Sequence, residues 1–237
     1  MSDWKAKRFW KEAVVVPSTG GFAIELDGRL VKTPAKRPLI LPTEVIADAV
    51  AAEWQAQEGV IKPQTMPVTK TANAAIDKVS VQHAEVADML AAYGDADLTC
   101  YRAEAPEGLV ARQTAQWDPM LDWAEQALNV RLQTRVGVIH QPQDPVELRK
   151  LSARTHAFDA FELTAFHDLV SLSGSLILGF AATLEARDPQ ELWNLSRLDE
   201  IWQAEQWGHD DDAEAMAALK MAGFLHACRM FRLCQFN

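Results

Sequence analysis

The chain has 237 residues, of which 49% are hydrophobic and 24% are charged. This composition is typical of a folded protein with a substantial core, and it excludes a disordered chain. The formal net charge of −10, from 23 basic and 33 acidic residues, argues against a nucleic-acid-binding protein. Basic residues are concentrated in the first 40 positions, and we interpret them as a solvated face because no recognition motif accompanies them.

The spacing of the cysteines and the length of the apolar runs bear on the cellular location of the protein. Cys100, Cys228 and Cys234 match neither a zinc site nor a disulfide framework, which is typical of a reducing compartment. The N-terminal residues include acids and lack an apolar stretch, so we expect no secretory signal. The longest uncharged run, 169–184, is shorter than the roughly 18 residues of a membrane-spanning helix. We expect a soluble cytoplasmic protein without membrane insertion.

The first 42 residues predict β structure. A short β-branched run at 13–16 is followed by a turn, and apolar and polar residues then alternate over 22–26. Asp27-Gly28 joins this strand to 29–32 and is a strong signal for a two-residue hairpin. A further short strand is expected at 39–41.

Helical patterns begin at Thr43, which is a suitable N-cap. Ile46, Val50 and Trp54 follow at four-residue spacing, so we expect Trp54 to have a structural role, packed onto the β layer. Pro67 and Ser80 are expected to open two more helices. Residues 1–100 are therefore predicted to form an α+β domain.

Residues 101–237 are predicted to form a mainly α-helical domain, which makes the fold class α+β. A helical pattern over 109–129 is expected to be interrupted at Pro119. Residues 161–185 are apolar nearly all round and predict a single central helix. A final helix carries a stripe at spacings of three and four that predicts a packing seam, formed by Met216, Leu219, Gly223, His226, Met230 and Leu233.

One helix is predicted over 189–207, with Asp188 as its N-cap. One of its faces is an ordinary core stripe, on which Trp202 is expected to be structural. The opposite face carries Trp193, Glu200 and Trp207 at seven-residue spacing. A helix with large aromatics on both sides is either enclosed in a core or offers its second face to another molecule, and the sequence leaves both open.

The sequence gives weak support for catalysis. His209 and the acids Asp210, Asp211 and Asp212 resemble a metal cluster, but acids in a first helical turn are explained by the helix dipole. A metal-dependent hydrolase using Asp210–Asp212 remains the alternative function. No phosphate-binding loop or activated nucleophile is recognisable, so we expect neither enzymatic activity nor a cofactor.

Four stretches together resemble a known family: LDGRLVKTPAKRPLILPT, AAEWQAQ, DADLTCYRAEAPEGLVARQTAQWDPMLDWAE and LSRLDEIWQAEQWG. In this order and spacing they resemble the assembly chaperones of the ATP synthase F(1) catalytic head, which bind the alpha subunit. The resemblance covers nearly the whole chain. It implies a small N-terminal β-containing domain, a helical C-terminal domain and no enzymatic activity.

The resemblance also implies a partner and sensitive positions. The chaperone is expected to hold unassembled alpha subunit until the beta subunit replaces it, in the bacterial cytoplasm here and in the mitochondrial matrix for organelle relatives. The sensitive positions correspond to Trp54 and to one of the acids Asp199, Glu200 and Glu205. Combined with the helix pattern, this gives a partner-binding set of Trp193, Glu200, Glu205 and Trp207, with no nucleic acid as partner.

Overall fold

The computed structural model describes residues 7–236, which divide into two compact units. The first contains the chain up to His83 together with Ala160–Thr164 and the segment from Arg229 onward, and the second contains Ala84–Asp159 and Ala165–Cys228. The first division of the chain therefore falls after His83, whereas the sequence predicts a boundary at residue 100. The reason is that η3 (Ala92–Ala96) packs against α5 (Pro145–His156) and α7 (Leu176–Thr183), two helices of the second unit.

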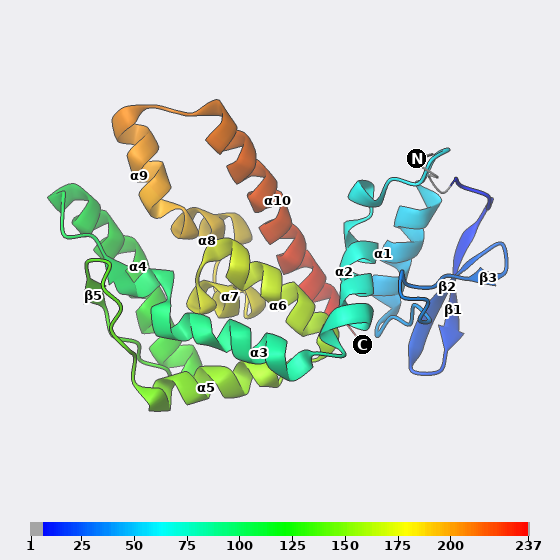
Figure 1. The fold of residues 1–237 in the computed structure, drawn as a ribbon, viewed down its shortest axis with the longest axis horizontal. Coiled ribbons are helices and arrows are strands. Elements are labelled where there is room, and N and C mark those ends of the chain that lie inside the picture. Colours follow the sequence, from blue (N-terminus) through cyan, green and yellow to red (C-terminus); the bar gives the residue numbers. More distant parts are fainter. Residues whose placement is uncertain (1–6, 237) are drawn as a thin grey trace. The chain divides into compact units, whose positions relative to one another are not determined.

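The first unit contains the predicted sheet. Strands β1 (Ala13–Ser18), β2 (Gly21–Leu26) and β3 (Arg29–Leu30) form an antiparallel meander in this order (Figure 1). Asp27 and Gly28 both have positive φ, at 48° and 79°. Two such residues match the twist of the flanking strands, so the hairpin prediction is confirmed.

Helix α1 (Glu44–Gln55) packs against β1 and β2 and against α2 (Pro67–Ala74). The Thr43 hydroxyl accepts a hydrogen bond from the Ile46 N–H at 3.2 Å, so the predicted N-cap is present. The remaining turns of this unit are η1 (Pro63–Thr65) and η2 (Ala75–Val79). Its core includes Ile24, Leu39, Leu41, Ile46, Val50 and Val68.

The second unit is built from helices around α7. Its elements are α3 (His83–Ala91), η3, η4 (Leu98–Cys100), β4 (Tyr101–Arg102), α4 (Glu107–Leu128), β5 (Arg135–Val136), α5 (Pro145–His156), α7 (Leu176–Thr183), α8 (Pro189–Ser196), α9 (Leu198–Trp207) and the greater parts of α6 (Ala160–Ser173) and α10 (Asp211–Cys234), whose ends at Ala160–Thr164 and from Arg229 belong to the first unit. Helix α7 contacts α4, α8 and η3, and its first six residues are all buried. Strands β4 and β5 pair in parallel.

Helix α4 is continuous, and the predicted interruption at Pro119 is wrong. Pro119 is exposed to solvent, and so is Ala115, whose carbonyl loses its helical hydrogen bond to the proline. Water can solvate that carbonyl, which lowers the cost of the proline. The neighbouring buried side chains Trp117 and Met120 hold both halves of the helix against the core.

The apolar run 161–185 forms two helices, not the single helix predicted. Gly174 has a φ of 72° and ends α6, and the Ser175 hydroxyl then accepts the Leu178 N–H to begin α7. Asp97 is fully buried beside this junction. Its carboxylate accepts the Ser175 hydroxyl at 2.7 Å, the Ile177 N–H at 3.0 Å, and the N–H and hydroxyl of Thr99 at 2.9 and 2.7 Å. Burial raises the pKa of Asp97, and these hydrogen bonds oppose the rise.

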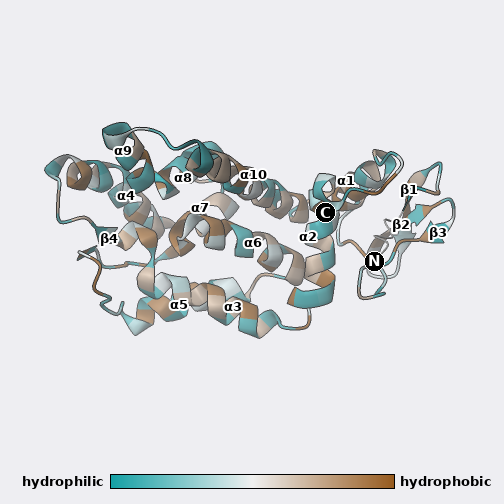
Figure 2. Cartoon of the chain, turned by 45° about the horizontal axis from the view of Figure 1, so that its top comes forward, coloured by the Kyte–Doolittle hydropathy of each residue, from teal (hydrophilic) through white to brown (hydrophobic). Residues whose placement is uncertain are grey.

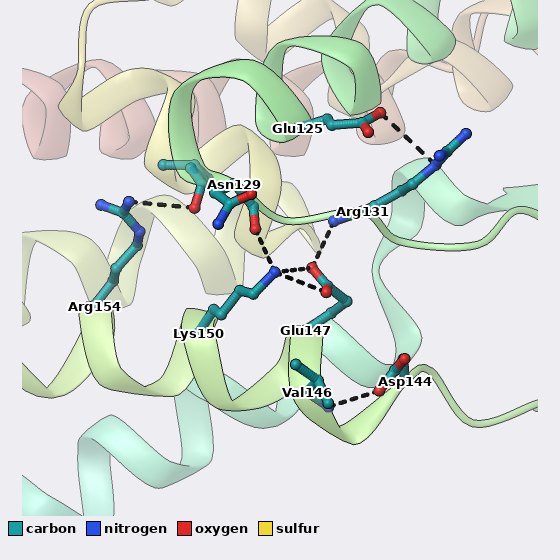
Figure 3. Close-up of polar contacts among 9 residues, drawn as sticks. Glu125, Asn129, Arg131, Asp144, Val146, Glu147, Lys150 and Arg154 are labelled. Carbon is teal, nitrogen blue, oxygen red and sulfur yellow. Dashed lines mark hydrogen bonds and ion pairs between the residues drawn. The ribbon is translucent and has the colours of Figure 1, made fainter.

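The C-terminal end of α4 is held by side chains of α5 (Figure 3). The Lys150 ammonium donates to the Asn129 carbonyl at 2.7 Å and to the Glu147 carboxylate at 2.8 and 3.0 Å. Glu147 also accepts the Arg131 N–H at 2.8 Å, and Arg154 donates to the Leu128 carbonyl at 3.2 Å. Cations here satisfy the unpaired carbonyls of the helix end and oppose its dipole.

The mixed architecture, with a small N-terminal sheet followed by a mainly helical region, confirms the α+β prediction. Within residues 7–236, no helix combines the length and the apolar character needed to cross a membrane.

Candidate functional site

The predicted helix over 189–207 is divided in two at Arg197, between α8 and α9. The indole N–H of Trp117, from α4, donates to the Leu195 carbonyl at 2.9 Å, and the Ser196 hydroxyl donates to the Trp193 carbonyl at 2.7 Å. Both contacts compete with the helical pattern of backbone hydrogen bonds. The predicted alignment of Trp193, Glu200 and Trp207 on one face is therefore wrong.

Trp193 lies in the core of the second unit. Its side chain is only 4% exposed, and its ring lies 5.8 Å from that of Phe224 in α10. Trp207, in contrast, is 79% exposed at the end of α9. We therefore leave Trp193 out of the candidate surface and keep Trp207.

Helix α9 packs on the N-terminal part of α4 through Trp202, which is half-buried. A Cβ atom at Gly108 would lie 2.7 Å from Cη2 of Trp202, so glycine at this position lets the indole approach the helix. The guanidinium of Arg112, one turn along α4, lies 5.0 Å from the Trp202 ring centroid, within range of a cation–π interaction. This geometry supports a structural role for Trp202.

Glu205 is paired with the same arginine. The two N–H groups of Arg112 meet its two carboxylate oxygens at 3.0 and 2.8 Å, a bidentate arrangement. The hydrogen bond from Arg112 lowers the pKa of Glu205. Both side chains remain partly open to solvent, so the pair also has surface available to another molecule.

The other two acids of α9 have different partners. Asp199 accepts a hydrogen bond at 2.7 Å from the Gln113 amide, and the oxygen of that amide accepts the Ala103 N–H at 2.8 Å. Gln113 is buried, so Asp199 belongs to a structural network. Glu200 is exposed and pairs at 2.7 Å with Arg197, the residue that precedes α9.

A groove of about 610 Å³ lies beside these residues, between α4 and the α8–α9 pair. Its lining includes Arg112, Gln116, Arg187, Glu191, Ile201 and Glu205. Arg187 and Glu191 pair at 3.3 Å, so charged groups of both signs line the groove. We name the surface formed by Gly108, Arg112, Trp202 and Glu205 the α4–α9 face, and Trp207 follows it at the end of α9. Such a mixed surface suits reversible protein binding better than catalysis.

Trp54 lies in the first unit. It is half-buried and packs edge-to-face on Trp10, with ring centroids 5.3 Å apart. Its neighbour Glu53 accepts the backbone N–H groups of Val68 and Thr69, at 2.7 and 2.8 Å, and so caps α2. The end of α1 is thus connected to Trp10 through Trp54 and to the start of α2 through Glu53. These contacts support the structural role predicted for Trp54.

The acids of the hydrolase alternative are not arranged as a metal site. Within residues 7–236, no cluster of three His, Cys, Asp or Glu side chains is placed to hold a metal ion. Asp210 accepts the Ala213 N–H at 2.9 Å, which caps the start of α10, and the His209 ring contacts Glu214. These contacts match the helix-start interpretation of the acids.

Sequence reasoning missed Gly108, Arg112 and Gln113. Arg112 and Glu205 are 93 positions apart, so no local pattern links them. The available signal was the four-residue spacing of Gly108 and Arg112, which places a gap and a cation on one side of α4.

Comparison with known proteins identifies a protein family and relatives that match this chain. The family model described as ATP12 chaperone protein matches residues 7–125. A mitochondrial atp12 protein of Schizosaccharomyces pombe is 26% identical over 219 residues, covering 87% of this chain and 75% of its own length.

Two solved bacterial structures share the fold. Atp12 from Paracoccus denitrificans is 49% identical with a TM-score of 0.96, over 98% of this chain and 100% of that one. A protein of Agrobacterium tumefaciens is 38% identical with a TM-score of 0.91, over 95% and 85%. The chain therefore belongs to the ATP12 chaperone family, the assembly chaperones of the ATP synthase F(1) catalytic head.

Proposed function

We propose that the protein holds unassembled alpha subunit of ATP synthase until the beta subunit replaces it, and that the α4–α9 face and the adjacent Trp207 make this contact. Membership of the ATP12 family supports the general role. The observation that carries the assignment of the surface is Trp207, a large aromatic side chain left 79% exposed at the end of α9, two residues after Glu205. Exposed tryptophans are frequent anchors of protein interfaces.

The test is capture of purified alpha subunit by tagged protein, with Trp207→Ala and Glu205→Lys compared with wild type. Trp207→Ala should leave the melting midpoint nearly unchanged, because the ring is exposed, and should weaken capture about 30-fold. Glu205→Lys should weaken capture less as salt concentration rises, because salt screens charge pairs.

Glu85→Lys, an exposed charge reversal on α3, is the matched control and should bind normally. Normal capture by both Trp207→Ala and Glu205→Lys would place the contact elsewhere. Release of captured alpha subunit on addition of beta subunit tests the replacement step, and persistence of the complex in excess beta subunit would contradict it.

The holding role requires no catalytic step and no cofactor. We therefore expect no heat of binding when ATP and magnesium are titrated into the protein, and a micromolar dissociation constant would contradict this. We also infer that the protein acts in the bacterial cytoplasm, since its solved relatives are bacterial. Cell fractionation with an antibody against the protein tests this location.

A further inference from the structure

The first half of α10 has an uncovered apolar face. Met216 is 53% exposed and Leu219 is 68% exposed, although both belong to the stripe that predicts a packing seam. Further along the helix the seam is present: Met230 is fully buried and Leu233 nearly so. The packing prediction therefore holds for one end of the stripe and fails for the other.

The end of α6 explains where the covering stops. A Cβ atom at Gly223 would lie 3.1 Å from the side chain of Leu172, so this face of α10 packs against α6 at that level. Leu172 is the last residue but one of α6. Leu219 and Met216 lie one and two turns further toward the start of α10, beyond the end of the helix that would cover them.

Acidic groups surround the start of this face. Asp210, Asp211, Asp212 and Glu214 lie within five residues, and Lys220 is the single lysine or arginine between Gly208 and Gly223. Figure 2 shows this start of α10 as a hydrophilic segment, next to the loop from α9. The uncovered apolar pair is therefore placed in a negative local field, which attracts basic segments and repels acidic ones.

We propose that the Met216–Leu219 face of α10 docks a basic amphipathic helix of the client that the protein holds. A helix surface offers side chains only, because its backbone N–H and C=O groups bond within the helix, so strand addition is excluded. A partner helix can instead place its apolar ridge against Met216 and Leu219 and its cations beside the acids. Methionine suits such a contact, because its flexible side chain adapts to different partners.

Charge argues against a second copy of this chain as the occupant. Two α10 faces brought together would place both sets of acids at one interface, in a chain whose net charge is already −10. Such a contact would be weakened by like-charge repulsion, whereas a basic helix gains from the same groups. This proposal rests on the proposed holding of the alpha subunit but concerns a different surface from the α4–α9 face.

The experiment measures the affinity of purified alpha subunit for the full-length protein carrying Met216→Glu and Leu219→Glu together. The control carries Ala218→Glu, which adds negative charge to the same stretch of α10 at an exposed position that points away from Met216 and Leu219. We expect affinity to fall at least about tenfold for the first variant and to change little for the control. Melting midpoints of all three proteins should agree, because every changed residue is exposed.

A photo-crosslinking residue at position 219 then identifies the segment bound. Crosslinks to a helical alpha-subunit segment with net positive charge support the proposal, and crosslinks to a strand or an acidic segment overturn it. If the wild type forms a dimer in solution and the variant with Met216→Glu and Leu219→Glu does not, self-association replaces the proposed docking. Unchanged affinity of the Met216 and Leu219 variant, with capture still lost in Glu205→Lys, overturns this proposal alone. Absence of capture by wild type overturns the holding function as well.

Discussion

Lys150 offers a direct test of how α4, the helix that presents Gly108 and Arg112, is held in place. We consider Lys150→Met, which keeps most of the aliphatic side chain and removes the ammonium group. The change removes the hydrogen bond to the Asn129 carbonyl and the ion pair with Glu147 (Figure 3). Asn129 has a φ of 55° and ends α4, so its carbonyl has no helical partner to replace the ammonium.

The expected loss follows from these contacts. A hydrogen bond to a charged group contributes about 1.5 to 3 kcal/mol, and we take the lower value because a third of the Lys150 side chain is exposed. The ion pair adds about 0.5 kcal/mol after screening by solvent. Together these give about 2 kcal/mol, or a fall in melting midpoint of roughly 4 to 8 °C for a chain of this size.

The assay is thermal unfolding followed by circular dichroism, with Arg149→Met as the control. Arg149 precedes Lys150 on α5 and is exposed, so its replacement should lower the midpoint by less than about 2 °C. The pKa of Glu147, which the hydrogen bond from Lys150 lowers, should rise in Lys150→Met and can be followed by NMR titration. Equal midpoints for the two variants would refute the view that Lys150 anchors α4.

Three further outcomes are expected. The pKa of Glu205 is lowered by Arg112 in the folded state, so the pair stabilises the fold above the unfolded pKa near 4.5 and this stabilisation is lost as pH falls through the folded pKa. The difference in melting midpoint between wild type and Glu205→Gln should therefore vanish in acid. A difference that stays constant with pH would contradict the pairing. Asp97→Ala leaves four buried donor groups without their acceptor, whereas Asp97→Asn keeps one acceptor oxygen, so the alanine variant should lose several times more free energy of unfolding. Denaturant midpoints of the two variants measure this, and equal losses would count against the network. Trp54→Ala should cost about 2 to 3 kcal/mol, less than a fully buried tryptophan, and an unchanged denaturant midpoint would remove its structural role.

Local signals in the sequence predicted much of the fold correctly. The Asp27-Gly28 hairpin and the N-caps Thr43 and Asp188 are where the sequence places them. Each depends on residues within a few positions, and the side chain itself supplies the hydrogen bond that begins the helix.

The failures arise where a distant group decides the local structure. Apolar periodicity continues unbroken across Gly174 and Arg197, so it predicts one helix in each place where there are two. The deciding groups are Asp97 and Trp117, which lie about 80 positions earlier in the chain and bond to the two junctions. No pattern in either helix reports such a partner.

The acids of α9 show why the sequence could not select one of them. Asp199, Glu200 and Glu205 lie on one short helix with similar local surroundings, yet each has a different partner. Reversing the charge of Asp199 would place a cation beside the buried amide N–H of Gln113, which then has no acceptor, so the main effect should be lower stability. Reversal of Glu200 disturbs only an exposed contact between neighbours in sequence. Glu205 alone among the three lines the groove between α4 and the α8–α9 pair, so its reversal is the one expected to reach client capture. Because the same change breaks the pair with Arg112, a midpoint near that of Glu205→Gln combined with weaker capture is the result that assigns the loss to binding.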